Sequence, residues 1–258
     1  MKTIAIVNLK GGVAKTATSA NLAYELATRY GKRVLLIDCD QNMGATMLLL
    51  PPERHRNTVT ALLTGICDYP YDMIYKTKYK GVDIIPADES LAAYGTDAFA
   101  SGKCHVTALR DLCEALAEDD AYDYIIIDSA PGMAAPMVCT VYAADDIIIP
   151  MTLDFYGLGG MRHLMTQIDS VREIRPEVRI AGCLVTMFRA DRETDADLDR
   201  LRKDSPVHVF ARPVRWSKVV RTKTKEQSVI LEASPYCAAS LDYKAFVAEL
   251  LEREAQGL

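Results

Sequence analysis

The sequence contains no closely spaced pair of cysteines. Its seven cysteines are odd in number, lie far apart and form no C-x-x-C motif: Cys39, Cys67, Cys104, Cys113, Cys139, Cys183 and Cys237. A disulfide framework and a structural zinc site both need cysteines at regular or paired spacings, so neither is predicted. We interpret the cysteines as mostly buried thiols of a protein in a reducing cytoplasm.

Long apolar runs and a surplus of positive charge are also missing. The longest uncharged stretch, residues 129–144, contains two prolines and is too short to span a bilayer. The N-terminus runs directly into a strand-like segment and lacks the features of a signal peptide, so neither export nor membrane insertion is expected. The net charge of −5 argues against a protein that coats nucleic acid with its whole surface, but it leaves room for a local basic patch.

The 258 residues show no internal repeat and no linker rich in proline, glycine or serine. A single domain over residues 1–258 is therefore predicted. Residues 41–80 are less regular than the rest, with two adjacent prolines and a run of tyrosines and lysines. We expect an insertion of short helices and loops there, near the ligand crevice.

Short β-branched runs alternate with segments of helical periodicity. The expected strands are 3–8, 33–38, 82–86, 124–128, 146–150, 178–185 and 207–210, and the expected helices are 15–30, 106–118, 157–173, 195–203 and 243–251. Uninterrupted apolar strands of this kind are buried on both faces, as in a parallel sheet. The pattern predicts an α/β fold with a doubly wound, mostly parallel sheet, helices on both faces and a ligand crevice at the carboxyl ends of the strands.

The first expected strand leads into a glycine-rich loop and then into a helix. The loop reads Leu9-Lys10-Gly11-Gly12-Val13-Ala14-Lys15-Thr16 and has the strand, loop and helix context of a phosphate-binding loop. Glycines let backbone N–H groups surround phosphate oxygens, while Lys15 supplies a cation and Thr16 a hydroxyl ligand for Mg²⁺. The weaker alternative is an ordinary glycine-rich turn between a strand and a helix.

Two later strands end in carboxylates. One ends in Asp38 and Asp40, which are two residues apart and therefore lie on the same side of the chain at the crevice edge. The other ends in Asp128 and has the Walker B form, in which the carboxylate holds Mg²⁺ through water. The alternative for Asp38 and Asp40 is that they are solvated carboxylates at the end of a strand.

Together these segments resemble the deviant Walker A ATPases, the ParA/Soj/MinD group, and most closely ParA and Soj. The loop of that family reads K-G-G-x-G-K-[ST] and begins with an additional lysine, here Lys10. The resemblance covers most of the chain and implies that ATP or ADP binds through one continuous segment: Lys10, Gly11, Gly12, Val13, Ala14, Lys15, Thr16 and Ala17.

The resemblance also implies roles in catalysis. Mg²⁺ is expected beside Thr16 and Asp128, with Asp38 in its outer shell, and Asp40 is expected to position the water that attacks the γ-phosphate. Lys15 is expected on the β- and γ-phosphates. Lys10 is expected to reach the phosphates of a second subunit, in a homodimer that forms when ATP binds.

Two residues in the loop depart from the family pattern. Ala14 replaces the glycine before the catalytic lysine, where a positive φ costs a non-glycine residue about 1–3 kcal/mol. Ala17 stands where many members have a hydroxyl residue. After the strand that ends in Asp40, the segment Gln41-Asn42-Met43-Gly44-Ala45-Thr46 matches the usual P-Q-G-N-A-T only at its last two residues.

Residues 212–225 carry six cations and no acid. The segment resembles the P-R-N-V-R-L-S stretch of the family, and cations gathered on one surface bind the DNA backbone by releasing counterions. The candidates for DNA contact are Arg189, Arg212, Arg215, Lys218 and Arg221. The competing interpretation is a solvated face that binds nothing.

The resemblance to ParA and Soj implies a slow, Mg²⁺-dependent ATPase that acts in partitioning of plasmid, chromosomal or mobile-element DNA. The expected partners are a second copy of the chain, non-specific double-stranded DNA and a ParB-like centromere-binding or cargo protein, in the nucleoid-associated cytoplasm. No helix-turn-helix domain fits before residue 9, so sequence-specific operator binding is not expected.

Three alternatives are weighed against this interpretation. A nucleotide-gated scaffold that hydrolyses ATP weakly or not at all is open, because Ala14 and Ala17 alter the loop. A MinD-like positioning ATPase needs a basic, amphipathic C-terminal tail, whereas residues 241–258 are net acidic. An iron protein of the nitrogenase type needs cysteines that bridge a cluster, and neither Cys104 nor Cys139 has the expected flanking glycines.

Overall fold

The computed structural model describes residues 1–51, 57–67, 69–99, 101–102, 104–154 and 157–258. Within these ranges the strands form one seven-stranded sheet in the order β3-β4-β2-β5-β1-β6-β7. All neighbouring strands are parallel except β3, which pairs antiparallel with β4 at one edge. The strands are β1 (Lys2–Ile6), β2 (Val34–Cys39), β3 (Tyr75–Lys76), β4 (Val82–Ile85), β5 (Tyr124–Ser129), β6 (Asp146–Met151) and β7 (Arg179–Val185).

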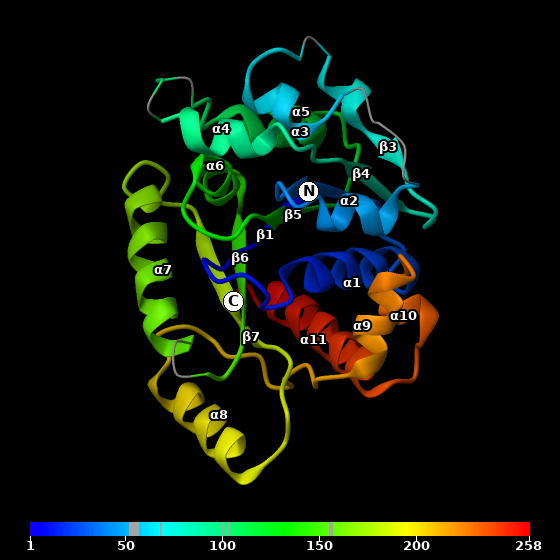
Figure 1. The fold of residues 1–258 in the computed structure, drawn as a ribbon, viewed down its shortest axis with the longest axis vertical. Helices are drawn as coiled ribbons and strands as arrows, with labels where there is room; N and C mark the ends of the chain where they lie inside the picture. The colour runs from blue at the N-terminus through cyan, green and yellow to red at the C-terminus, as the bar shows by residue number, and fades with distance from the viewer. Residues whose placement is uncertain (52–56, 68, 100, 103, 155–156) are drawn as a thin grey trace.

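Helices cover both faces of this sheet (Figure 1). They are α1 (Lys15–Thr28), α2 (Gly44–Leu49), α3 (Val59–Leu63), α4 (Leu91–Asp97), α5 (Ala108–Glu118), α6 (Ala135–Ala143), α7 (Gly157–Arg172), α8 (Arg192–Asp204), α9 (Lys218–Lys225), α10 (Ile230–Ala233) and α11 (Ala238–Ala255), with a short 3₁₀ helix at Pro70–Met73. The predicted α/β fold with a doubly wound, mostly parallel sheet is confirmed. None of the described helices has the length and apolar character that a membrane-spanning segment requires.

The two faces of the sheet form separate apolar layers. Successive residues of a strand point to opposite faces, so Leu36 and Ile126 pack toward α1 and α11, while Leu35 and Ile125 pack toward α5 and α6. Strands β2 and β5 are buried along their whole length. This burial explains why their sequences are continuously apolar until the terminal aspartates.

Two features at the sheet edges differ from the sequence prediction. Residues 207–210 do not form a strand, since only an isolated bridge joins Val209 to Cys183 of β7. The N–H of Phe210 and the carbonyl of His208 each make one hydrogen bond to Cys183, which is too little pairing for a strand. The short edge strand β3 lies in the region that was predicted to contain only helices and loops.

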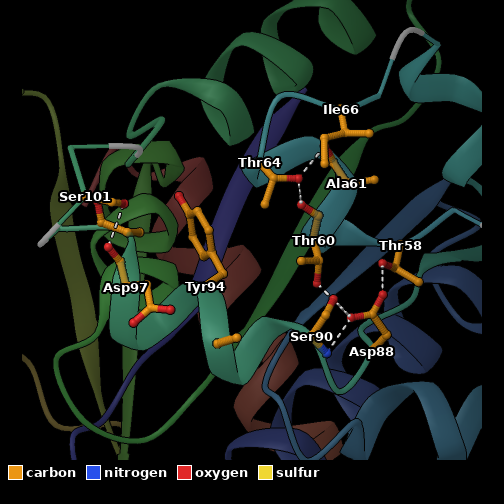
Figure 2. Close-up of a pocket in the computed structure, with 12 residues that line it drawn as sticks. Thr58, Thr60, Ala61, Thr64, Ile66, Asp88, Ser90, Tyr94, Asp97 and Ser101 are labelled. Carbon is orange, nitrogen blue, oxygen red and sulfur yellow. Dashed lines mark hydrogen bonds between the residues drawn. The ribbon is translucent and has the colours of Figure 1, made fainter.

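Residues 41–80 contain α2, α3, the 3₁₀ helix and β3, so the predicted short helices are present in the described part of this region. Its helix α3 and the later helix α4 border a pocket (Figure 2).

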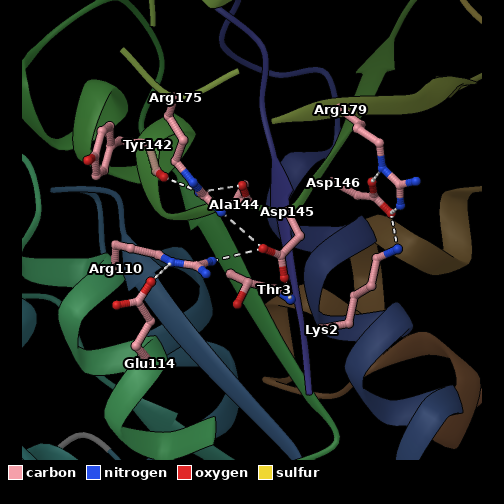
Figure 3. A network of polar contacts seen from close by, with 10 residues as sticks. All are labelled: Lys2, Thr3, Arg110, Glu114, Tyr142, Ala144, Asp145, Asp146, Arg175 and Arg179. Atoms are coloured by element: carbon pink, nitrogen blue, oxygen red, sulfur yellow. Dashed lines mark hydrogen bonds and ion pairs between the residues drawn. The ribbon is translucent and has the colours of Figure 1, made fainter. Parts of the chain in front are cut away.

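Polar contacts fix the amino ends of the central strands (Figure 3). The guanidinium of Arg175 donates to the carbonyls of Tyr142 and Ala144 and to Asp145, which also receives hydrogen bonds from Arg110 and from the N–H of Thr3. This network joins β1 and α5 to the residues just before β6 and just after α7, at one end of the sheet. The candidate functional site lies at the opposite edge of the sheet, at the carboxyl ends of the parallel strands.

Candidate active site

The glycine-rich loop joins the end of β1 to the start of α1, as predicted. Lys15 is the first residue of α1, and its ammonium donates to the carbonyls of Asn8 and Lys10, both at 3.1 Å. Lys15 is only 6% exposed. Burial lowers its pKa, while the charges of Asp128 and Asp40 act in the opposite direction. The lysine is therefore held over the loop at the edge where the acidic residues gather.

Two residues of the loop have a left-handed backbone. Gly12 has a φ of 74°, and a Cβ built on it would meet no atom within 4 Å. Ala14, the residue before Lys15, has a φ of 64° and a ψ of 31°. The sequence analysis expected backbone strain at Ala14 if its φ were positive, and the φ is positive. Alanine here occupies a conformation that costs an L-residue about 1–2 kcal/mol relative to the right-handed region.

Asp38 and Asp128 lie side by side at the ends of β2 and β5. They are directly paired in the register of these parallel strands, and both are fully buried. Burial raises the pKa of each carboxyl, and the neighbouring carboxylate adds to the increase for Asp128. The hydroxyls of Thr16 and Ser19 act against the increase at Asp128.

The two carboxylates differ in how they are hydrogen-bonded. Asp38 Oδ2 accepts from both the N–H and the hydroxyl of Thr46 at 2.8 Å, and its Oδ1 accepts from the N–H of Asp40 at 3.0 Å. Asp128 Oδ1 accepts from the Ser19 hydroxyl at 2.9 Å. Asp128 Oδ2 is buried and accepts no hydrogen bond from the described residues.

This arrangement fits a Mg²⁺ ion. A buried carboxylate oxygen without a hydrogen bond is costly unless a cation or water satisfies it. Within the described ranges no group of three or more histidine, cysteine, aspartate or glutamate side chains forms a complete metal cage. Mg²⁺ commonly takes one or two protein ligands and completes its shell with water and substrate phosphates. The residues that would hold the ion are Thr16 and Asp128, with Asp38 in the outer shell.

Asp40 is almost buried and begins a tight turn. Its Oδ1 accepts from the backbone N–H and from the side-chain amide of Asn42, both at 2.9 Å. The turn continues through Met43, which has a φ of 54° and stands at the glycine position of the P-Q-G-N-A-T pattern. Both loops beside the site therefore carry a non-glycine residue in the left-handed region.

Lys10 is paired within its own chain. Its ammonium forms an ion pair with Asp154, in the segment that follows β6, and lies 3.5 Å from the hydroxyl of Thr152. The Lys10 side chain is 45% exposed. The additional lysine is thus held by an acidic residue that the sequence analysis did not identify.

Two of the five DNA candidates have a structural role. Arg212 Nε donates to Asp242 at 2.6 Å, and Arg215 contacts both oxygens of the same carboxylate at 2.8 Å. Asp242 is on α11 and is fully buried. The sequence interpretation of residues 212–225 as a run of uncompensated cations needs this correction, because an acid thirty residues later neutralises part of the charge.

The other candidates lie at the surface where it is described. Arg189 is exposed and its guanidinium lies 4.4 Å from the ring centre of Trp216, which is 46% exposed. Residues 188 and 215 are joined by an isolated parallel bridge, so the loop after β7 and the basic segment are adjacent. Lys218 is exposed at the start of α9, and the side chain of Arg221 lies outside the described residues.

Sequence reasoning missed four residues that support the site or the basic segment: Ser19, Thr46, Asp154 and Asp242. Ser19 lies four residues after Lys15 and therefore on the same face of α1, which is a usable signal. Thr46 is one of the two positions that match the family pattern. Nothing local marks Asp154 or Asp242, whose partners are distant in the sequence.

The strand order, the loop after β1 and the aspartate at the end of β5 define a P-loop nucleoside triphosphatase. A family described as an AAA domain matches residues 1–180. The chromosome partitioning protein ParA of Caulobacter vibrioides is 32% identical over 264 residues, covering 98% of this chain and 95% of that protein. The chain belongs to the ParA/Soj/MinD family of P-loop ATPases.

Solved structures agree with this fold. Apo McdA of Cyanothece superposes with a TM-score of 0.84 at 22% identity, covering 97% of this chain and 99% of that one. Cobyrinic acid a,c-diamide synthase of Mycobacterium smegmatis, solved with ADP and magnesium, gives a TM-score of 0.81 at 25% identity and covers 100% of this chain and 97% of that one.

Proposed function

We propose that the chain is a slow, Mg²⁺-dependent ATP hydrolase that partitions DNA by forming an ATP-dependent homodimer. The observation that carries the nucleotide chemistry is the juxtaposition of Lys15 with the buried pair Asp38 and Asp128, one of whose oxygens accepts no hydrogen bond from described residues. Full-length similarity to a chromosome partitioning protein supports the choice of DNA as the cargo.

Each residue of the site then has a distinct role. Backbone N–H groups of the loop and the ammonium of Lys15 bind the β- and γ-phosphates, so Lys15 exchanges its two carbonyl partners for phosphate oxygens. The magnesium ion, when bound, neutralises charge on these phosphates. Thr16 and Asp128 hold it, and Asp38 is kept in place by Thr46.

Asp40 orients the water that attacks the γ-phosphate. Its carboxylate is fixed by Asn42 and lies at the end of the strand next to β5. Slow turnover suits a protein whose ATP-bound state has to persist. Face-to-face dimerisation then brings Lys10 to the phosphates of the second subunit, where it offsets the charge that develops in the transition state.

DNA binding is assigned to the surface around Trp216. Arg189, Lys218 and Arg221 contact phosphates without reading bases, while Arg212 and Arg215 position the segment through Asp242. The expected location is the nucleoid, and a ParB-like or cargo protein stimulates hydrolysis.

ATP turnover with and without duplex DNA, measured together with mass by light scattering, tests this function. We expect a low rate of turnover, a mass that doubles only with Mg²⁺·ATP and DNA binding confined to the dimer. The left-handed Ala14 favours a second candidate, a nucleotide-gated scaffold. Dimerisation with ATP but without detectable hydrolysis would identify that scaffold.

A further inference from the structure

A pocket of about 470 Å³ lies between α3 and α4, outside the nucleotide site (Figure 2). This volume is within the range of about 300–1,000 Å³ that is typical of ligand sites. The lining includes hydroxyl side chains and two carboxylates: Thr58, Thr60, Thr64, Ser90, Asp88 and Asp97. Figure 2 shows Asp97 and Asp88 on opposite sides of Tyr94.

The hydroxyls nearest to Asp88 already donate to it. Thr60 donates to Asp88 Oδ1 at 3.0 Å, and the hydroxyls of Thr58 and Ser90 donate to the same carboxylate, as does the backbone N–H of Ser90 at 2.9 Å. Burial acts to raise the pKa of Asp88, but these hydrogen bonds outweigh it and hold the pKa below its ordinary value. Asp88 therefore keeps its negative charge at neutral pH.

The remaining hydroxyls of the pocket also donate within the protein. Thr64 donates to a carbonyl of α3 at 2.7 Å, Ser101 donates to a carbonyl of α4 at 2.7 Å, and Tyr94 donates to the thiol of Cys104 at 3.8 Å. A hydroxyl has one proton, so these groups have only lone pairs left for a ligand. The side chains of the pocket can therefore accept hydrogen bonds from a ligand, but few of them have a proton left to donate.

Among the described residues that line the pocket, no positively charged side chain balances its two carboxylates. Asp97 is exposed, and its carboxylate makes no hydrogen bond or ion pair with the described part of the chain. The described lining includes no lysine, arginine or histidine. A ligand that supplies donors and positive charge matches such a site, whereas phosphates and carboxylates are repelled.

We propose that this pocket binds an arginine or lysine side chain of a partner protein, flanked by apolar residues. A guanidinium has five donors and no acceptor, which complements a lining with acceptors only. Ile66 at the rim is 76% exposed and Phe99, just beyond α4, is 52% exposed, so apolar surface continues outside the cavity. A peptide with apolar residues beside its cation would cover this apolar rim, whereas a small free amine would leave the rim exposed to water. The rim therefore favours a protein partner.

A short hydrogen-bonded path leads from the pocket to the active site. Asp88 follows Ala87, whose N–H donates to the hydroxyl of Thr46 at 2.9 Å, and Thr46 donates in turn to Asp38. A partner bound at Asp88 therefore touches a loop that is two hydrogen bonds from the metal side of the site. This inference rests on the proposed function, because it places a partner that modulates ATP turnover.

The test uses the full chain with ¹³C-labelled alanine and isoleucine methyl groups. The probe is the peptide acetyl-Leu-Arg-Ala-Leu-amide, and the matched control peptide has citrulline, an uncharged isostere, in place of arginine. We expect the methyl signals of Ala61, Ala98 and Ile66 to shift with the arginine peptide. The citrulline peptide should bind about tenfold more weakly, because it loses the charge-assisted hydrogen bonds.

Two variants locate the effect. Asp97→Asn is expected to weaken arginine-peptide binding about threefold while ATP turnover without peptide is unchanged. Asp195→Asn removes one charge from α8, away from the pocket, and is expected to leave binding unchanged. Shifts confined to other methyl groups, equal binding of both peptides, or equally tight binding of spermidine would each overturn the proposal. Absence of ATP turnover in the unmodified chain, with peptide binding intact, counts against the proposed function alone.

Discussion

Lys10 and Asp154 form an ion pair that joins the loop after β1 to the segment after β6. The lysine expected to act on a second subunit is thus neutralised inside its own chain. A dimer that uses Lys10 in trans has to break this contact first. Because both side chains are partly exposed, the contact holds the lysine only weakly.

Removal of the acid is therefore expected to favour the dimer. Asp154→Asn should lower the ATP concentration that gives half-maximal dimerisation by about 1.4-fold to fivefold, since an exposed pair contributes about 0.2–1 kcal/mol. Lys10→Ala should stay monomeric with ATP. Light scattering across an ATP titration checks both variants, and an ATP-dependent dimer of Lys10→Ala would remove its role in trans.

Asp40→Ala is expected to abolish ATP hydrolysis and leave ATP binding largely intact. Asp40 is fixed by Asn42 and is separate from the lysine and hydroxyl that hold the phosphates and the metal. Phosphate release and binding of a fluorescent ATP analogue measure the two properties. Asp72→Ala, which removes an exposed aspartate elsewhere, is the control; parental turnover in Asp40→Ala contradicts the assignment.

Glycine at Ala14 is expected to relieve backbone strain. The φ of 64° favours glycine, but glycine also gains entropy in the unfolded chain, so the net gain in stability is about 0.5–1 kcal/mol. The variant Ala14→Gly should also tighten nucleotide binding or raise turnover, because a methyl group leaves the phosphate cradle. Calorimetric melting and ATP titration measure the two effects.

Met43→Gly provides the matched comparison, since its φ of 54° is also left-handed. The same gain in stability is expected there without a direct effect on the phosphates. Unchanged stability, affinity and rate in Ala14→Gly would mean that the loop accepts alanine without strain.

The sheet was predicted correctly because each strand is marked by residues that are adjacent in the sequence. Continuous apolar runs such as 34–37 and 124–127 can be recognised without knowledge of their neighbours in the sheet. The order of the glycine-rich loop and the aspartates indicated which edge of the sheet carries the candidate site. Residues 207–210 were wrongly predicted as a strand because a β-branched run does not reveal how much pairing its neighbour offers. Here that neighbour is the edge strand β7, and only one bridge forms.

The partners of charged groups were the least predictable feature. Arg215 and Asp242 are 27 residues apart, and Lys10 and Asp154 are 144 residues apart. Charge counting treats such groups as independent, whereas the fold brings them together. The left-handed Ala14, by contrast, was anticipated as a condition of the loop, because the family pattern has glycine at that position.

The paired carboxylates predict a pH dependence of the protein without nucleotide. Burial raises the folded-state pKa of Asp38 and Asp128, so the folded state binds protons more tightly than the unfolded chain. Stability from these groups is then highest at low pH and is lost as pH rises from their ordinary pKa of 3.8 toward the raised value, about 7 for Asp128.

Asp128→Asn should therefore raise the melting temperature near pH 7.5 and have little effect near pH 4. Mg²⁺·ATP should raise the melting temperature of the parent more than that of the variant at pH 7.5, because the cation offsets the buried charge. Differential scanning calorimetry at the two pH values measures this. A destabilised variant at pH 7.5 would show instead that Lys15 and the Ser19 hydroxyl stabilise the Asp128 carboxylate by more than its burial costs.

The last prediction concerns DNA binding. The cations to change are chosen among those that do not pair with Asp242. Charge reversal at Arg215 leaves the buried Asp242 carboxylate without its bidentate partner, so we expect a loss of about 1–3 kcal/mol of stability whatever its effect on DNA. Arg189→Glu combined with Lys218→Glu changes exposed cations instead, and should preserve the melting temperature and basal ATP turnover.

That double variant should lose non-specific duplex binding. In the parent, the proposed dimer would place two copies of the surface around Trp216 on one particle, so binding should require ATP and be similar for different duplex sequences. Each phosphate contact adds about 0.9 to the slope of log affinity against log salt, and the ATP dimer should show a steeper slope than the monomer. Lys80→Glu, at an exposed lysine between β3 and β4, is the control for a charge reversal elsewhere on the surface. If ATP-loaded parent protein has no salt-sensitive affinity for duplex DNA, or if Arg189→Glu with Lys218→Glu binds as the parent does, these cations form a solvated surface and DNA contact lies elsewhere.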